Sequence, residues 1–124
     1  MKYNKSIEMY LETIYILEID HGHAHVVDIA EHLGITKPSV TKAMDRLKQA
    51  GLVNKESYGH INLTDKGCVV AKKIYYKHCI VARFLEKSLG LSPREASINA
   101  CRMEHFITDK MLEAIEAYVG ENKA

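Results

Sequence analysis

The stretch VVDIAEHLGITKPSVTKAMDRLKQAG, residues 26–51, decides the fold because its apolar spacing predicts two short amphipathic helices that meet at a tight turn. Gly34 ends the first helix. Thr36 or Lys37 caps the second helix, and Pro38 suits its first turn. We expect the buried side chains to be Val27, Ile29, Ala30 and Leu33 in the first helix and Val40, Ala43, Met44 and Leu47 in the second. Two helices joined in this way form a helix-turn-helix.

Two β-prone runs follow this pair of helices directly. They cover residues 52–55 and 61–63, and they flank a turn at residues 57–60. Such an arrangement predicts a two-stranded hairpin. A helix-turn-helix followed by a hairpin is a winged helix. The order and spacing of the pieces, rather than any single residue, support this interpretation.

Further helices are expected on both sides of the winged-helix core. Residues 6–19 carry apolar side chains at helical spacing, with Met9 and Glu12 on a separate face. After the hairpin, a long helix is followed by a second one that Ser92 caps and that continues through His105. A last helix ends before Gly120. The expected fold class is mainly α: an N-terminal winged helix-turn-helix with a two-stranded β wing, followed by an α-helical domain.

The composition allows one modest core, or a small domain with an appended helical part. The 124 residues include 17 Lys and Arg and 16 Asp and Glu, so any basic nucleic-acid footprint must be local. No apolar run is long enough to span a bilayer, and the first residues lack the hydrophobic region of a signal peptide. The three cysteines are far apart, which argues against a disulfide framework and indicates a reducing, cytoplasmic setting.

The segment CRMEH, residues 101–105, concentrates three good metal ligands. On a helix, Cys101, Glu104 and His105 stand at positions i, i+3 and i+4 and therefore share one face. One interpretation is a partial metal site whose other ligands come from elsewhere in the chain. The alternative is a polar surface turn, because such triples of polar residues are common.

The start of the second helix in the helix-turn-helix has the chemistry of a DNA-reading surface. Such a helix normally enters the major groove with its N-terminal residues against base edges. Hydroxyls and lysines dominate here, and no carboxylate occurs before Asp45. The candidate contacts are Thr36, Lys37, Pro38, Ser39, Thr41 and Lys42, with phosphate anchoring from Arg46 and Lys48. Lys55 and His60 extend this basic side onto the wing. The alternative is a protein-contact surface whose lysines are merely solvated.

Four segments together resemble the metal-dependent repressors of the diphtheria-toxin-repressor and manganese-repressor family. They are IEMYLETIY (7–15), the winged helix, YKHCIVARFLEKSLGL (76–91) and CRMEHFITD (101–109). The resemblance covers essentially the whole chain, and both the Glu-Met-Tyr-Leu run and the Cys-x-x-Glu-His run match the iron-responsive branch. It implies that the activating metal is bound by four residues: Met9, Cys101, Glu104 and His105.

The resemblance also implies a candidate second metal site. Glu12 matches a ligand position of the manganese branch, and His78 matches a histidine used for a second metal in both branches. Glu104 would be shared between the two sites. The chain departs from the iron branch at Ala82 and Ser97, where that branch carries a Glu and a His ligand. We also expect no C-terminal SH3-like domain of the kind found in that branch.

The ligand types favour iron. A thioether, a thiolate, an imidazole and a carboxylate suit Fe(II), Co(II), Ni(II) or Zn(II), whereas Mn(II) prefers oxygen ligands. We therefore expect a metal-activated repressor of a double-stranded DNA operator, with Fe(II) favoured and Mn(II) as the alternative. Residues 1–70 would form the winged-helix DNA-binding domain, and residues 71–124 the metal-binding and dimerisation domain. The last two helices, with Leu112 and Ile115, would form the homodimer because little of the chain is left to cover them.

Two other functions compete with this one. The first is a winged-helix regulator that binds DNA without metal. The second is a metalloenzyme, which is disfavoured because no His-Glu-x-x-His run accompanies the ligands. We expect neither enzymatic activity nor a membrane or small organic substrate as a partner.

Overall fold

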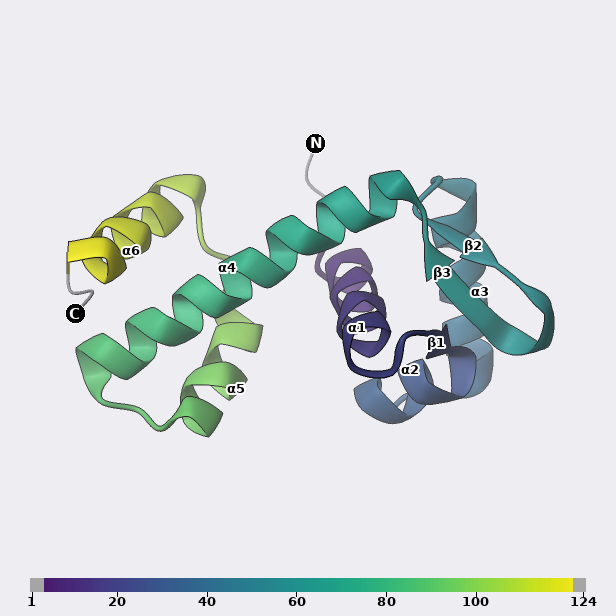
Figure 1. Cartoon of the computed structure of the whole chain (residues 1–124), viewed down its shortest axis with the longest axis horizontal. Coiled ribbons are helices and arrows are strands. Elements are labelled where there is room, and N and C mark those ends of the chain that lie inside the picture. Colours follow the sequence, from purple (N-terminus) through teal and green to yellow (C-terminus); the bar gives the residue numbers. More distant parts are fainter. Residues whose placement is uncertain (1–3, 122–124) are drawn as a thin grey trace. The chain divides into compact units, whose positions relative to one another are not determined.

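The chain divides into two compact units in the computed structural model, which describes residues 4–121 (Figure 1). The first unit comprises Met1–Lys72 and the second Lys73–Ala124. Helix α4 (Asp65–Leu89) contributes residues to both. Within residues 4–121, no helix has the length and apolar character needed to cross a membrane.

The first unit is a winged helix, as predicted. Helix α1 (Lys5–His21) precedes the helix-turn-helix, which consists of α2 (Val26–Leu33) and α3 (Lys37–Gln49). Strands β2 (Val53–Lys55) and β3 (His60–Leu63) then form the wing. This order of elements confirms the mainly α fold class.

The sheet has three strands rather than the two that the hairpin predicted. A short strand, β1 (Ala24–His25), pairs with β3, which gives the antiparallel order β1-β3-β2. Its two residues lie opposite Ile61 and His60. Gly22 accounts for the difference. It ends α1 in the left-handed conformation, with φ of 80°, and so turns the chain back along β3.

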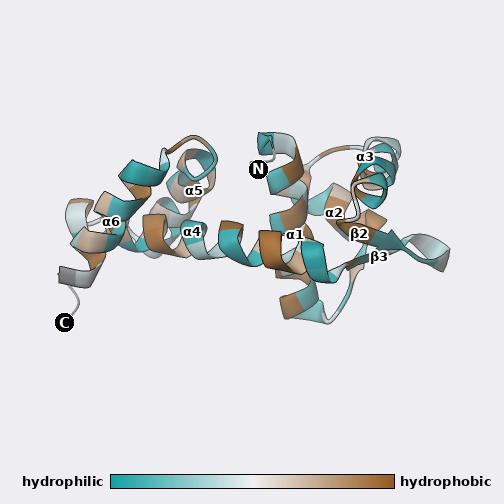
Figure 2. Cartoon of the chain, turned by 90° about the horizontal axis from the view of Figure 1, so that it is seen from above, coloured by the Kyte–Doolittle hydropathy of each residue, from teal (hydrophilic) through white to brown (hydrophobic). Residues whose placement is uncertain are grey.

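One apolar core holds the first unit together. The prediction was right for most buried positions of α2 and α3, although Val27, Leu33 and Ala43 are only half-buried. Val26 is buried instead of Val27, because it lies two residues after the buried Ala24 and on the same side of the chain. Helix α3 is largely hydrophilic beyond its buried stripe (Figure 2). The main core residues are Leu11, Ile14, Ile29, Val40, Met44, Leu47, Leu52, Val53 and Ile61.

Gly67 lets α4 begin directly against the start of the wing. The Thr64 N–H donates to the Leu52 carbonyl at 3.1 Å, and its hydroxyl donates to the Gly51 carbonyl at 2.6 Å. The Gly67 N–H donates in turn to the Thr64 hydroxyl oxygen at 3.0 Å. A Cβ on Gly67 would lie 2.0 Å from the Leu52 carbonyl oxygen. No side chain fits at Gly67 unless the backbone moves at this joint, where the start of α4 meets the start of the wing.

Glu18 connects α1 to the wing. Its carboxylate accepts a hydrogen bond from the Leu63 N–H at 3.4 Å. Burial raises the pKa of Glu18 above its usual 4.5, and the hydrogen bond from Leu63 opposes this shift only in part. Because the folded-state pKa is raised, the ionised carboxylate opposes folding at neutral pH. This cost disappears as the pH falls through the folded-state pKa toward 4.5.

The second unit packs the later part of α4 with α5 (Pro93–Met103) and α6 (Asp109–Glu121). Ser92 caps α5, as predicted, by accepting a hydrogen bond from the Glu95 N–H at 3.2 Å. The buried core of this unit consists of Val81, Leu85, Ala96, Ala100, Ile115 and Val119.

Two expectations for α6 were wrong. The helix does not end before Gly120 but continues to Glu121, because the buried Val119 holds its last turn against the core. Ile115 is only 2% exposed and packs within the chain's own core, so it does not face a second copy. Helices α4 and α5 cover Ile115, and the sequence did not reveal this packing. On α5 and α6, Ile98 and Met111 stay 40% and 43% exposed.

We predict that Gly67→Ala destabilises the chain by about 1–3 kcal/mol, because the added methyl group overlaps the Leu52 carbonyl. Urea unfolding followed by circular dichroism measures this change. Gly120→Ala is the matched control: nothing lies within 4 Å of its Cβ position, so it should gain about 0.5–1 kcal/mol of helix propensity. Equal stability of the two variants would contradict the close approach at the joint.

Candidate metal centre and nucleic-acid interface

Thr36 caps α3, and this role occupies its hydroxyl group. The Ser39 N–H donates to Thr36 Oγ1 at 3.3 Å, and Thr36 Oγ1 donates to Ser39 Oγ at 2.9 Å. Pro38 lies in the first turn, as predicted. The Thr36 side chain is therefore committed to the helix cap, whereas Ser39 keeps its own hydroxyl proton for donation.

The predicted contacts of α3 share one property, which is exposure. Exposed side chains at the start of the helix and along it are Thr36, Lys37, Pro38, Ser39, Thr41, Lys42, Arg46 and Lys48. Asp45, the single carboxylate in the sequence of α3, forms an ion pair with Lys55 of β2 at 2.6 Å. This pair neutralises the acidic group beside the basic surface, and it attaches the wing to the helix.

Glu104 lies fully buried between two imidazoles of the second unit. Its Oε2 accepts a hydrogen bond from His78 Nδ1 at 2.9 Å, and its Oε1 lies 3.3 Å from His105 Nε2. The other ring nitrogen of His78 lies 3.2 Å from Ser97 Oγ. A buried carboxylate is costly unless it is paired, so these contacts mark a polar cluster that compensates Glu104.

The turn after α5, not the helix itself, creates this cluster. We expected Cys101, Glu104 and His105 to share one face of a helix, but α5 ends at Met103 and Glu104 is its C-cap residue. His105 lies beyond it, in a turn. Two backbone hydrogen bonds close this turn: the Phe106 and Ile107 N–H groups donate to the Met103 carbonyl at 3.0 and 3.2 Å. Adjacent residues of a helix do not face each other. Leaving the helix therefore brings the His105 ring to its neighbour's carboxylate.

The donors of the second unit suit a divalent cation. Glu104 offers a carboxylate with the His78 and His105 imidazoles on its two oxygens. Cys101 offers a thiol from the exposed surface of the last turn of α5. Oxygen, nitrogen and sulfur donors together match the preferences of Fe(II), Co(II), Ni(II) and Zn(II). The residues present therefore fit a transition metal.

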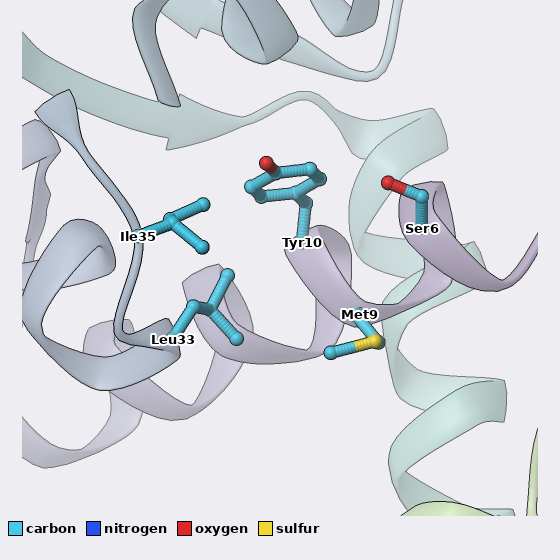
Figure 3. Close-up of a pocket in the computed structure, with 5 residues that line it drawn as sticks. All are labelled: Ser6, Met9, Tyr10, Leu33 and Ile35. Carbon is cyan, nitrogen blue, oxygen red and sulfur yellow. The ribbon is translucent and has the colours of Figure 1, made fainter. Parts of the chain in front are cut away.

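The other two predicted ligands, Met9 and Glu12, lie on α1 in the first unit. Glu12 is only 6% exposed, although it falls outside the apolar stripe of its helix. The Met9 side chain borders a pocket of about 180 Å³ in the first unit (Figure 3). The pocket is lined by Ser6, Met9, Tyr10, Leu33 and Ile35. The roles of Met9 and Glu12 as ligands stay predictions.

Two features of these sites were missed from the sequence. Ser97 was noted only as a departure from the iron branch, yet it contacts His78. Its place four residues before Cys101, on the same side of a helix, was the available signal. The ion pair between Asp45 and Lys55 was also missed. A single carboxylate on a basic helix facing a basic wing was the clue to it.

Two family models match the chain. The model described as iron dependent repressor, N-terminal DNA binding domain, matches residues 2–61. The model described as iron dependent repressor, metal binding and dimerisation domain, matches residues 64–124. Together they account for both halves of the sequence.

Relatives of known sequence are transcriptional regulators. An uncharacterized HTH-type transcriptional regulator of Methanocaldococcus jannaschii is 37% identical over 121 residues, which is 97% of each chain. The transcriptional regulator MntR of Salmonella typhimurium is 34% identical over 94% of this chain and 73% of its own length. The iron-dependent repressor IdeR of Mycobacterium tuberculosis is 35% identical over 82% of this chain and 44% of its own.

Solved structures share the fold. The structure of IdeR from T. acidophilum has a TM-score of 0.84 at 25% identity and covers 91% of this chain. A manganese-dependent transcriptional repressor in complex with manganese also has a TM-score of 0.84 at 25% identity and covers 92%. The chain spans about half the length of these two proteins, 53% and 52%.

The winged helix and the carboxylate–histidine cluster define a DNA-binding regulator with a metal-binding and dimerisation domain. The chain belongs to the iron-dependent repressor family, which is the diphtheria-toxin-repressor and manganese-repressor family that its sequence resembles. Members of this family are metal-dependent transcriptional repressors. The predictions of family, fold class and a regulator rather than an enzyme are thereby confirmed.

Proposed function

We propose that the chain is a homodimeric, Fe(II)-activated repressor that binds a double-stranded DNA operator in the cytoplasm. The observation that carries this proposal is the buried Glu104 carboxylate between the His78 and His105 imidazoles. It lies in the domain whose family model is described as metal binding and dimerisation. A carboxylate and imidazoles in contact are the hard and borderline donors that a divalent transition metal requires.

We assign the activating metal to four ligands: Met9, Cys101, Glu104 and His105. When bound, the cation supplies a positive charge that offsets the buried carboxylate. Cys101 must lose its thiol proton to serve as a ligand, and His105 must be neutral. Glu12 and His78 are assigned to a second site that shares Glu104. Ser97, which lies 3.2 Å from His78, orients that imidazole.

Ligands from both units explain how metal binding would control DNA binding. Met9 belongs to the unit that carries α3, and the other three assigned ligands belong to the second unit. Ligation by residues of both units favours the arrangement in which they meet, and a difference in affinity between arrangements is what a switch requires. We infer that this arrangement spaces the two recognition helices of the dimer for successive major grooves.

Sulfur ligands support iron as the physiological metal. A thiolate and a thioether are soft donors, whereas Mn(II) prefers oxygen. Manganese remains the alternative, because one similar structure is described as a manganese-dependent repressor and one relative as iron-dependent. A regulator that binds DNA without metal is the other alternative.

We place the DNA contacts on the exposed side of α3. Its start offers Ser39 and Lys42 for bases or phosphates, together with Thr36, Lys37, Pro38 and Thr41. Arg46 and Lys48 follow as phosphate anchors. The ion pair of Asp45 with Lys55 supports this placement, because it removes an unpaired negative charge from the surface that phosphates approach.

We place the dimer contact on the exposed apolar side chains of the second unit. Ile98 on α5 and Met111 on α6 are large side chains that the chain's own core does not cover. The description of the matching family model as a dimerisation domain supports this placement. Burying such side chains against a second copy is the usual use of exposed apolar groups in a symmetric dimer.

Fe(II) should tighten binding to a duplex selected from a randomised pool by the native chain, measured by fluorescence anisotropy under anaerobic reducing conditions. Cys101→Ala and His105→Ala should each abolish this gain because each removes a ligand. Cys68→Ala changes a half-buried cysteine outside the assigned set and should keep the full response. An unchanged response in Cys101→Ala would refute the ligand assignment. An equal response of the native chain to Mn(II) at matched free concentration would show that the sulfur ligands do not select Fe(II) over Mn(II).

Lys42→Ala should weaken binding to all duplexes similarly and lower the slope of log affinity against log salt by roughly one, as expected for a phosphate contact. Ser39→Ala should instead change the preference among sequences. Lys110→Ala, an exposed lysine on α6, is the control and should change neither quantity. If Lys42→Ala and Ser39→Ala both bind DNA as the native chain does, α3 is not the helix that contacts the DNA bases and phosphates.

Ile98→Glu combined with Met111→Glu should give a monomer in light scattering, because two charges would be buried at the interface. Far-ultraviolet circular dichroism should stay native, since both side chains are substantially exposed. Ile115→Glu should unfold the second unit instead, because this residue is core. Arg94→Glu, an exposed charge change on α5, is the control. A dimer of native mass in the double variant at low concentration would exclude this face.

A further inference from the structure

A single imidazole, that of His25, links the tip of the wing to the helix-turn-helix. Its Nε2–H donates to the Tyr58 carbonyl, and its Nδ1 accepts a hydrogen bond from the Val27 N–H at 3.2 Å, which caps α2. With an acceptor on one nitrogen and a donor on the other, the ring is the neutral Nε2–H tautomer. His25 therefore contacts the first turn of α2 and the end of the wing at once.

Neighbouring residues hold this ring in place. His60, the partner of His25 in the β1–β3 register, packs against it edge-on, with ring centroids 5.2 Å apart and an interplanar angle of 84°. Gly59 packs on the ring so closely that a Cβ there would lie 2.9 Å from His25 Cε1. The imidazole has little freedom to turn, so its hydrogen bond to the wing tip is a fixed link.

Tyr58 adopts an unusual backbone conformation at the tip. Its φ is 63°, and among residues 4–121 it is the one non-glycine residue with positive φ. A bulky residue keeps this left-handed conformation only where the surroundings enforce it, and such positions are often functional. Here it belongs to the tight turn between β2 and β3, because Gly59 also has a positive φ of 80° and the His60 N–H donates to the Ser57 carbonyl. The His25 bond to the Tyr58 carbonyl ties this turn to β1. The side chain itself is 91% exposed, so burial of the ring does not compensate the strain.

The wing is also fixed at its base, where Lys55 pairs with Asp45 of α3 at 2.6 Å. The two links attach the wing to the start of α2 and to α3, the helix that carries Ser39 and Lys42. The backbone that carries the Tyr58 phenol is therefore held, and the exposed hydroxyl of the phenol is a hydrogen-bond donor open to a ligand. Tyrosine hydroxyls are among the groups that bind DNA phosphates.

We propose that Tyr58 contacts the DNA backbone and that His25 is the positioning residue that holds it there. The inference rests on the proposed function, because it requires duplex DNA on α3. The ligand is a phosphate of the duplex beside the groove that α3 enters. Since the phenol is uncharged, the contact adds affinity without adding to counterion release, in contrast to Lys42.

The test uses the full chain with activating metal and the duplex selected from a randomised pool. Tyr58→Phe and His25→Asn should each weaken binding roughly 3- to 10-fold, the loss expected for one hydrogen bond, with the salt slope unchanged. Asparagine is a good helix N-cap but is shorter than histidine, so it keeps the cap of α2 and gives up the link to the wing. His32→Asn, on the exposed last turn of α2, is the control and should bind as the native chain does.

A double variant decides whether His25 acts through Tyr58. Tyr58→Phe with His25→Asn should bind no more weakly than His25→Asn alone. If the losses of affinity in the two single variants multiply in the double variant, His25 does not act through Tyr58 and the positioning role is overturned. Native affinity in both single variants would overturn the contact and leave Tyr58 as a site for a protein partner. If the native chain with metal selects no duplex at all, the proposed function fails instead, so the two failures are distinguishable.

Discussion

The Glu104 carboxylate is fully buried, and a charge removed from water must be compensated by donors or by a cation close to it. Compensation comes from His78 on α4 and from His105 in the turn before α6. This requirement limits how the second unit can be built. Helix α5 stops at Met103, and the turn that follows brings His105 to the carboxylate. Apolar residues of α4, α5 and α6 form the core of the same unit. The same compensation is what makes the cluster suited to a metal.

Polar links of a similar kind unite the winged helix. Its apolar core holds the elements together but does not fix their orientation, because hydrophobic burial is not directional. Direction comes from particular contacts: Lys55 to Asp45 at the base of the wing, Glu18 to Leu63 at its inner strand, and the imidazole of β1 at its tip. Each joins residues on different elements. The backbone of the wing is therefore held in a defined position relative to α1, α2 and α3.

The fold does not determine which metal activates the chain. The structure of an IdeR protein and that of a manganese-dependent repressor match it equally well, each with a TM-score of 0.84. A shared scaffold holds sites of different preference, and the preference has to come from the donor atoms. In this chain the thiol of Cys101 and the imidazoles beside Glu104 are the groups that differ in kind from an all-oxygen set.

The sequence by itself determined the helix-turn-helix and the start of α5, because helical periodicity and end caps are local. Thr36 with Pro38, and Ser92 with Glu95, act within one turn of the residues they cap. It also located the ligand segment from residue types alone. Only the tertiary structure decided the third strand, the end of α5 before His105, the burial of Ile115 and the link from His25 to the wing tip. Most of these depend on residues that are distant in the chain and meet in space. A pattern of local spacing carries no information about such contacts.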